Sequence, residues 1–415
     1  MRKNVLIIGN SVKEYALAKK LSENNNVFVA PGCKIMSDFV TCVDIREDSS
    51  KELLEYVLEN DINLTIPISE KSLDSNIVEL FNSNNQSIFA PSQDICKILF
   101  DKILIKKLLY KLRIPTPKFG IFEKQNMAYD YIKNIKNPFV MKTNEPSSAV
   151  ILNSQKTAKN ILDSIFAQTG QKVLIEDYVW GTPFSFYVIS DGYKALPLTS
   201  SIVYKHSLEG DGGQLTSGMG ACVPNYKLSL QNEYDIMDNV VQPVLEYLET
   251  MDLHYMGILG VNGILTEEGN IQVLGFTPFM QNVDCTAILN LIDIDLVNLI
   301  DSCIVGSFSD EYEYIPQKEL SATILVAICK NKINNENIVK GTELLNEETF
   351  LDFYPTVIKN RFLEYESQYG AVLNLTSFAR SITSAKTKVY NEMANLSFDG
   401  MYYRKDICKS NTESF

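Results

Sequence analysis

The chain has 415 residues, of which 45% are hydrophobic and 21% are charged, and its formal net charge is −13 at pH 7. These fractions are typical of a globular protein with a fully buried core, and the length predicts about two to four domains. The acidic balance disfavours nucleic acid or an anionic membrane as the main partner.

Cysteines and apolar runs limit the class of protein further. The eight cysteines include no pair with C-x-x-C spacing, and there are only two histidines, so no structural zinc site is expected. The first apolar run, at residues 5–8, is too short for a signal sequence, and no run approaches the roughly 20 residues that span a bilayer. We therefore expect a protein of the reducing cytoplasm, with no membrane partner.

Residues 1–100 alternate short apolar runs with helical patterns, which predicts a Rossmann-like parallel sheet. Ligands bind such sheets at the carboxyl ends of the strands. Gly9 there would let backbone approach a phosphate, although an ordinary tight turn explains it equally well. The G-x-G-x-x-G fingerprint of dinucleotide sites is absent. The expected strands are 5–8, 27–30, 39–43 and 64–68, with helices at 12–21, 53–58 and 72–82.

A lysine-rich pattern at residues 94–112 predicts one long helix, which the sequence Ile114-Pro115-Thr116-Pro117 ends. We expect this linker helix and an α+β lid subdomain at residues 101–190, followed by a core subdomain at 191–316. The glycine-rich segment 207–220 is either a mobile active-site loop or a long connection. Residues 317–415 predict a small α+β C-terminal domain.

Residues 257–284 contain two apolar runs, at 258–265 and 271–276, on either side of the turn sequence TEEGN. This pattern predicts a β-hairpin, which we expect to form the floor of a nucleotide site. A magnesium-dependent ligase would need carboxylate or amide oxygens on such strands. The second strand has Gly275 and Thr277 at the positions concerned.

The order of these parts resembles one family, the phosphoribosylamine–glycine ligases of the ATP-grasp superfamily. VLIIGNSVKEYA at residues 5–16 is similar to that family's V-L-V-I-G-x-G-G-R-E-H-A. DGGQLTSGMGA at 211–221 parallels D-T-G-P-N-T-G-G-M-G-A, and RKDI at 404–407 matches the terminal R-K-D-I. Each motif alone is weak, but their shared order covers nearly the whole chain and implies an ATP-grasp fold.

The resemblance implies a reaction in which ATP activates glycine as an acyl phosphate and 5-phosphoribosylamine then attacks it. ATP and Mg²⁺ are the implied cofactors, and small molecules the implied partners. The nucleotide-binding residues implied are Lys102, Lys142 and Glu176, with an ordinary surface lysine or an exposed acid as the alternative at each position. The residues implied to bind substrate are Gly9, Asn10, Lys13, Gly32, Glu70, Gly218 and Gly220. The catalytic candidates are Asp211 and Asp284.

The chain departs from the family pattern around the ATP phosphates and the metal. The glycine-rich lid loop D-G-L-A-A-G-K-G is replaced by NEPSSA at residues 144–149, which contains Pro146. In I-E-F-N-C-R-F, the glutamate falls on Gly275, the asparagine on Thr277 and the arginine on Phe279. No metal ligand is therefore assigned, and Asp284 is the most plausible substitute.

Several hypotheses remain open. The first is an active ligase, with the family's substrates or with changed ones. The second is a catalytically impaired homologue that binds, senses or scaffolds. We expect a monomer or a pairing with a homologous protein.

Overall fold

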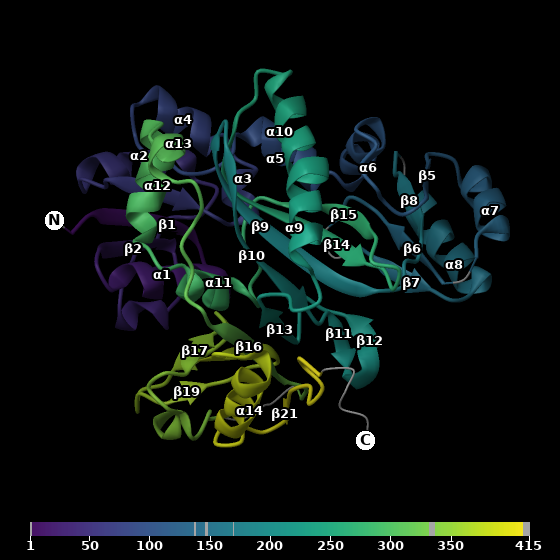
Figure 1. Cartoon of the computed structure of the whole chain (residues 1–415). Coiled ribbons are helices and arrows are strands. Elements are labelled where there is room, and N and C mark those ends of the chain that lie inside the picture. The colour runs from purple at the N-terminus through teal and green to yellow at the C-terminus, as the bar shows by residue number, and fades with distance from the viewer. Residues whose placement is uncertain (1, 137, 146–147, 169, 332–336, 410–415) are drawn as a thin grey trace.

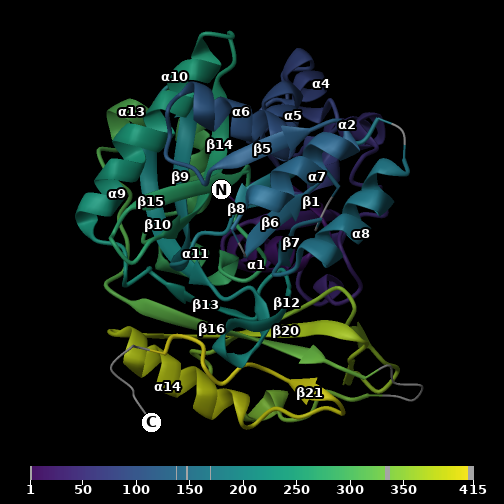
Figure 2. The ribbon, with the colours of Figure 1, turned by 90° about the vertical axis from the view of Figure 1, so that its right-hand side faces the viewer.

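The protein is described by a computed structural model that covers residues 2–136, 138–145, 148–168, 170–331 and 337–409. A central group of long strands separates the N-terminal domain from the lid subdomain (Figure 1). The C-terminal strands and helix α14 (Ile382–Met393) lie below both, and a view turned by 90° shows them as the base of the molecule (Figure 2).

The N-terminal domain is built on a parallel sheet in the order β3-β2-β1-β4, which confirms the expected Rossmann-like arrangement. The central strand, β1, is buried because elements pack on both faces of the sheet. The helix expected at residues 72–82 is wrong, because Asp74 ends one helix and Asn76 begins the next. The strands are β1 (Asn4–Gly9), β2 (Asn26–Pro31), β3 (Thr41–Cys42) and β4 (Leu64–Pro67). The helices are α1 (Val12–Ser22), η1 (Met36–Asp38), α2 (Ser50–Glu59), α3 (Glu70–Leu73) and α4 (Ile77–Ser83).

The single long helix expected at residues 94–112 is also wrong. The structure has two helices there, α5 (Gln93–Phe100) and α6 (Lys102–Lys111). Asp101 between them has extended backbone angles, and its carboxylate accepts hydrogen bonds from the backbone N–H groups of Ile103 (2.8 Å) and Leu104 (2.9 Å). This side chain caps α6, so the chain changes direction at a residue that helical periodicity alone does not reveal.

The lid subdomain has an antiparallel sheet in the order β5-β8-β6-β7. Its two helices pack on this sheet and form a hydrophobic cluster separate from the other cores. The lid is therefore a packing unit of its own. Its elements are β5 (Phe119–Phe122), α7 (Gln125–Asn134), β6 (Phe139–Lys142), β7 (Val150–Leu152), α8 (Gln155–Phe166) and β8 (Val173–Asp177).

A nine-stranded antiparallel sheet forms the rest of the framework, in the order β15-β14-β9-β10-β13-β16-β20-β17, with β21 beside β16. The expected boundary at residue 190 falls inside β9, and the one after residue 316 separates β13 from β16, which pair directly. The core subdomain and the C-terminal domain therefore share one sheet. Its strands are β9 (Thr182–Gly192), β10 (Ala195–Val203), β13 (Gly220–Val223), β14 (Tyr255–Leu265), β15 (Ile271–Thr277), β16 (Ser321–Cys329), β17 (Phe350–Phe353), β20 (Gly370–Ala379) and β21 (Met401–Tyr402).

The hairpin expected at residues 258–276 is present as β14 and β15, with Asn262 directly opposite Gly275. Its turn closes through hydrogen bonds from Thr266 N to Asn270 O (2.9 Å) and from Gly269 N to Thr266 O (3.0 Å). Gly269 has φ +83°, a conformation that favours glycine.

Helices cover this sheet, together with a few short elements. Within the described residues, no helix combines the length and apolar character needed to cross a bilayer. The helices are α9 (Leu230–Ile236), η3 (Met237–Val241), α10 (Gln242–Glu249), α11 (Cys285–Leu291), α12 (Leu296–Val305), α13 (Phe308–Glu311) and η4 (Thr342–Leu344). The remaining short strands are β18 (Ile358–Lys359) and β19 (Tyr365–Glu366).

The glycine-rich segment at residues 207–220 is partly ordered as a second hairpin rather than a plain loop. Its strands are β11 (His206–Leu208) and β12 (Gly212–Leu215), joined by η2 (Glu209–Asp211). No disulfide was expected from the cysteine spacing, but Cys222 on β13 and Cys408 form one, and the other six cysteines are free.

We expect Leu325→Ala to destabilise the whole core, because Leu325 is fully buried in β16, between β13 and β20. Truncation of a buried leucine costs about 2–5 kcal/mol. Urea unfolding monitored by circular dichroism should show a lower midpoint. Leu344→Ala is the control, since Leu344 is 62% exposed. Equal midpoints for both variants would contradict the central position of β16.

Candidate active site

A cavity of about 590 Å³ lies between α6, the lid strands and the β14–β15 hairpin. This volume lies within the range of small-molecule sites. Four of the residues singled out from the sequence line the cavity: Lys102, Lys142, Glu176 and Asp211. The structure thus brings the nucleotide-binding candidates from α6, β6 and β8 to one place.

Glu176 is 1% exposed and forms ion pairs with two lysines. Its Oε1 lies 2.6 Å from Lys106 Nζ, and its Oε2 contacts Lys142 Nζ. Burial alone would raise the pKa of Glu176, but the two ammonium groups outweigh it and lower the pKa. Burial also lowers the pKa of Lys106 to about 8, against the attraction of Glu176. That Glu176 binds a nucleotide stays a prediction.

Lys102 joins the start of α6 to the segment after β6. Its Nζ donates to the carbonyl oxygens of Thr143 (2.9 Å) and Glu145 (2.6 Å) and to Ser148 Oγ (2.9 Å). Burial lowers the pKa of Lys102, and nearby Lys142 lowers it further. Lys102 therefore holds the ends of the segment that replaces the family's glycine-rich loop. Pro146 and Ser147 of that segment lie outside the described residues.

Three cavity lysines were missed in the sequence analysis, namely Lys106, Lys205 and Lys227. Lys106 was one of several lysines on a helix expected to be solvated, yet its side chain is 1% exposed. Lys205 follows β10, is half-buried, and lines the cavity. Burial lowers the pKa of Lys205, while Asp284 opposes that shift. Lys106 could have been found from its spacing in the sequence, because it lies one helical turn after Lys102 on the same helix face.

At the expected metal position the structure has neutral groups. Asn262 Oδ1 accepts hydrogen bonds from Ser185 Oγ (2.8 Å) and Gln281 Nε2 (2.8 Å). Asn262 Nδ2 donates to Thr277 Oγ1 (3.4 Å), and Gln281 Nε2 also donates to Ser185 Oγ (3.0 Å). Gly275 contributes no side-chain oxygen. We name these four side chains the neutral network: Ser185, Asn262, Thr277 and Gln281.

The neutral network does not fit the Mg²⁺ that the ATP-grasp resemblance implies. Mg²⁺ in such sites is held through one or two carboxylates besides phosphates and water. Here the amide oxygen of Asn262 is already engaged by two donors. No group of three or more His, Cys, Asp or Glu side chains in the described ranges is arranged to hold a metal ion.

Asp284, the expected substitute ligand, does not reach the cavity. It is fully buried, and its Oδ2 accepts hydrogen bonds from Tyr187 Oη (2.9 Å) and Ser201 Oγ (2.6 Å). It is absent from the lining of the cavity. Burial raises its pKa to about 6, although the bonds from Ser201 and Tyr187 and the charge of Lys205 oppose the shift.

Asp211 lines the cavity but is also tied to the C-terminal segment. Its Oδ1 accepts from Arg404 Nη2 (3.0 Å), and Arg404 Nη1 donates to the carbonyl of His206 (3.0 Å). Asp406 Oδ2 accepts from the backbone N–H of Gly210 (2.8 Å). The RKDI sequence at residues 404–407 thus anchors the β11–β12 hairpin beside the cavity.

Gly218 and Gly220 are packing positions rather than cavity walls. A Cβ on Gly218, which has φ +136°, would lie 2.5 Å from Val283 Cγ2. One on Gly220 would lie 2.7 Å from the carbonyl oxygen of Ile324. Neither glycine lines the cavity.

The candidates of the N-terminal domain lie away from this cavity, around the carboxyl ends of β1, β2 and β4. Gly9 ends β1 beside Pro31, and Gly32 N donates to Gly9 O (3.2 Å). Asn10 and Glu70 are exposed at the same edge. This is the edge at which parallel sheets bind ligands, as expected.

Glu14, which the sequence analysis did not single out, organises this edge. It is fully buried, and its Oε2 accepts from the backbone N–H of Ser11 (2.8 Å). Gly9 is required here, because a Cβ on it would lie 2.4 Å from Glu14 Oε1. Asn282 joins the edge to the core, since its Oδ1 accepts from Ser11 Oγ (2.9 Å) and Lys13 N (3.3 Å).

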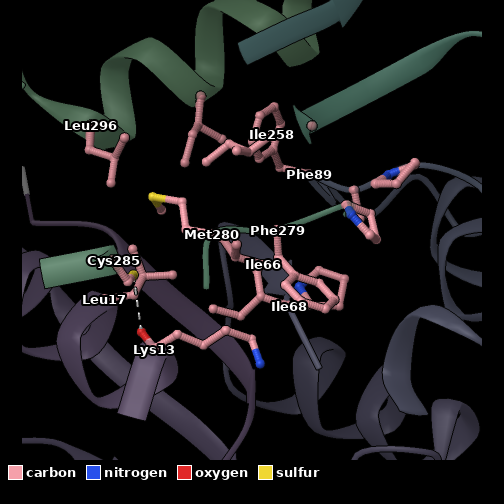
Figure 3. A pocket seen from close by; sticks show the side chains of 16 residues that line it. Lys13, Leu17, Ile66, Ile68, Phe89, Ile258, Phe279, Met280, Cys285 and Leu296 are labelled. Carbon is pink, nitrogen blue, oxygen red and sulfur yellow. Dashed lines mark hydrogen bonds between the residues drawn. The ribbon is translucent and has the colours of Figure 1, made fainter. Parts of the chain in front are cut away.

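Lys13 borders a small apolar pocket between the N-terminal domain and the core (Figure 3). Its ammonium lies 3.3 Å from Glu14 Oε1 and 4.7 Å from the ring centroid of Phe279. The Cys285 thiol donates to the Lys13 carbonyl (3.7 Å), as the dashed line in Figure 3 shows. With a volume of about 30 Å³, this pocket is far smaller than the roughly 300–1,000 Å³ of small-molecule sites.

The first two thirds of the sequence match two models of one family. The N-domain model of phosphoribosylglycinamide synthetase matches residues 3–98, and the ATP-grasp (A) domain model matches residues 100–285. The chain belongs to the phosphoribosylglycinamide synthetase family.

Relatives of this family are similar over nearly the full length. The phosphoribosylamine–glycine ligase of Caldanaerobacter subterraneus is 28% identical over 97% of this chain and 99% of its own. That of Fusobacterium nucleatum is 27% identical over 97% of both chains. The crystal structure of phosphoribosylamine–glycine ligase from Thermotoga maritima has a TM-score of 0.81 at 19% identity, covering 98% of this chain and 100% of that one. This structural likeness shows the fold.

A likeness at lower identity extends to the biotin carboxylase domain of another enzyme. The biotin carboxylase domain of the Hydrogenobacter thermophilus 2-oxoglutarate carboxylase, solved with MgADP and bicarbonate, has a TM-score of 0.71 at 13% identity. It covers 97% of this chain and 92% of that chain, so the shared fold includes the C-terminal strands.

We expect Lys106→Met to destabilise this synthetase family member by about 3–5 kcal/mol, since it removes one partner from a buried ion pair. Lys106 and Glu176 have side chains that are 1% and 2% exposed. Denaturant unfolding would measure the loss. The neighbouring exposed Lys107→Met is the matched control and should change stability little. A loss equal to that of the control would refute the structural importance of the pair.

The raised pKa of Asp284 predicts that the difference in unfolding free energy between wild type and Asp284→Asn depends on pH. Because folding raises the pKa of Asp284 from 3.8 to about 6, its contribution to stability is complete below pH 3.8 and is lost as pH rises through 6. The variant does not ionise here, so its stability relative to wild type should rise by about 3 kcal/mol between pH 4 and pH 7. Urea unfolding of both proteins at several pH values measures this. A constant difference would contradict the raised pKa.

Proposed function

We propose that the protein is an ATP-dependent carboxylate–amine ligase that joins glycine to 5-phosphoribosylamine. The carrying observation is the family match along the chain, together with a cavity to which Lys102, Lys142 and Glu176 converge. Cytoplasmic location, and a monomer or a pairing with a homologous protein, stay predictions.

The proposed chemistry has two steps. A glycine carboxylate oxygen attacks the γ-phosphorus of ATP, which releases ADP and forms an acyl phosphate. The amine nitrogen of phosphoribosylamine then attacks the acyl carbon, releases phosphate and gives up a proton. Lysines stabilise the charge on the transferred phosphoryl group electrostatically and position the reactants. Lys142 and Lys102 are suited to this because Glu176 and the segment after β6 fix their ammonium groups.

The N-terminal edge is the proposed site for the sugar phosphate. Gly9, Gly32 and the start of α1 lie together there, and Asn282 links them to the core. The N-terminus of a helix favours an anion such as a phosphate. Lys13 is close by, but Phe279 occupies the place of the family's arginine, which favours a ligase with a changed substrate as a variant of the proposal.

A second candidate function is nucleotide binding without turnover. The neutral network favours it, because charged ligands are missing where the family has a glutamate. Loss of a single preorganised electrostatic contact costs roughly 10²–10³-fold in rate. Product formation distinguishes the two functions.

The test incubates the purified chain with ATP, glycine and phosphoribosylamine and detects ADP and glycinamide ribonucleotide by mass spectrometry. We expect product, and we expect Lys142→Gln to lower kcat by about 100-fold or more. Lys107→Gln is the control, since Lys107 is exposed on α6. Other small amino acids in place of glycine test a changed substrate. No product with any amino acid, while ATP still binds, would establish the second function instead.

A further inference from the structure

The charges around the main cavity are unbalanced. Among its described lining residues are five lysines and three carboxylates, a surplus of two positive charges in a chain whose net charge is −13. One of the carboxylates, Asp211, is itself paired with Arg404, which is not a lining residue. The lysines are Lys102, Lys106, Lys142, Lys205 and Lys227.

This surplus opposes a divalent cation and attracts an anion. Like charges a few ångströms apart repel each other, and the repulsion grows in the low dielectric of a protein interior. The neutral network offers Mg²⁺ no carboxylate to offset that repulsion. A polyphosphate, by contrast, meets several ammonium donors.

We infer that this cavity binds a nucleoside polyphosphate as the metal-free anion, with lysines supplying the counter-charge that a divalent cation would otherwise provide. The inference deepens the proposed function and rests on it only in that a nucleotide enters this cavity. Free ATP carries about four negative charges near neutral pH and its magnesium complex about two, so the free form is attracted more strongly by the positively charged cavity.

The pKa values of the cavity lysines also favour a bound anion. Burial lowers the pKa values of Lys102, Lys106 and Lys205. A bound phosphate near these groups would favour their charged forms and raise those pKa values again. A bound anion would therefore stabilise the lysine charges that the protein's own carboxylates leave unbalanced.

The β14–β15 hairpin has room for a metal-binding side chain at position 275. The inference can therefore be tested by adding a carboxylate there and measuring whether Mg²⁺ then strengthens nucleotide binding. A Cβ on Gly275 would find its nearest heavy atom, Ile105 Cγ2, at 3.8 Å, an ordinary contact. Gly275 and Thr277 are two residues apart on β15, so their side chains project from the same face. Gly275→Glu with Thr277→Asn would place a carboxylate and an amide there.

The experiment is isothermal titration of the full chain with ATP and with ADP, in EDTA and in excess MgCl₂, without glycine or phosphoribosylamine. We expect wild type to bind at least as tightly in EDTA as in Mg²⁺. We expect Lys142→Gln to weaken binding in EDTA by about tenfold or more. Binding that is about tenfold tighter in Mg²⁺, or no binding in either condition, would overturn the inference.

The double variant Gly275→Glu/Thr277→Asn supplies the second arm. We expect its affinity to become about tenfold tighter in Mg²⁺ than in EDTA. Gly275→Gln/Thr277→Asn has nearly the same size without the charge and should keep the wild-type behaviour. Equal Mg²⁺ dependence of wild type and the double variant would count against the inference. Because only binding is measured, absence of ligase turnover would bear on the proposed function and not on this result.

Discussion

The carboxylate of Glu176, paired with Lys106 and Lys142, holds together the elements that line one side of the main cavity. It joins α6, β6 and β8, which belong to two different hydrophobic clusters. Taking three charged groups out of water is costly, and only their close mutual pairing offsets that cost. These ion pairs therefore hold the lid to the linker helix, although the two belong to separate hydrophobic clusters. The ammonium groups of Lys106 and Lys142 are therefore already in place before a phosphate binds.

The segment between β15 and α11 connects the two proposed subsites. Gln281 belongs to the neutral network at the cavity, while the next residue, Asn282, holds the start of α1 in the N-terminal domain. Two residues later Asp284 is buried under Tyr187 and Ser201. A change at one end of this segment is therefore transmitted over a few covalent bonds to the other. We therefore expect a substitution in this segment to affect both proposed subsites.

The sequence predicted the elements whose signals are local and left out those that depend on distant partners. The parallel sheet of the N-terminal domain and the β14–β15 hairpin follow from short-range patterns, and both are confirmed. Strand β13 was missed because it pairs with β16, far away in sequence, whereas β10 was missed although it forms a local hairpin with β9. Lys106 looks like any helix lysine until Glu176, seventy positions later, is brought beside it. Lys102, Lys142 and Glu176 were found through resemblance, since no local pattern marks them. Asp284 was misplaced because its burial depends on Tyr187 and Ser201.

The continuous nine-stranded sheet has a consequence for how this protein is made. β13 lies between β10 and β16, so one of its edges has no partner until residues 321–329 have been synthesised. β16 in turn pairs with β20, which ends at Ala379. Pairings over such separations close slowly, because the entropy of a long loop is lost before the contacts form. During synthesis the first half of the sheet therefore presents an open strand edge, the kind of surface that chaperones protect and that aggregates when left uncovered.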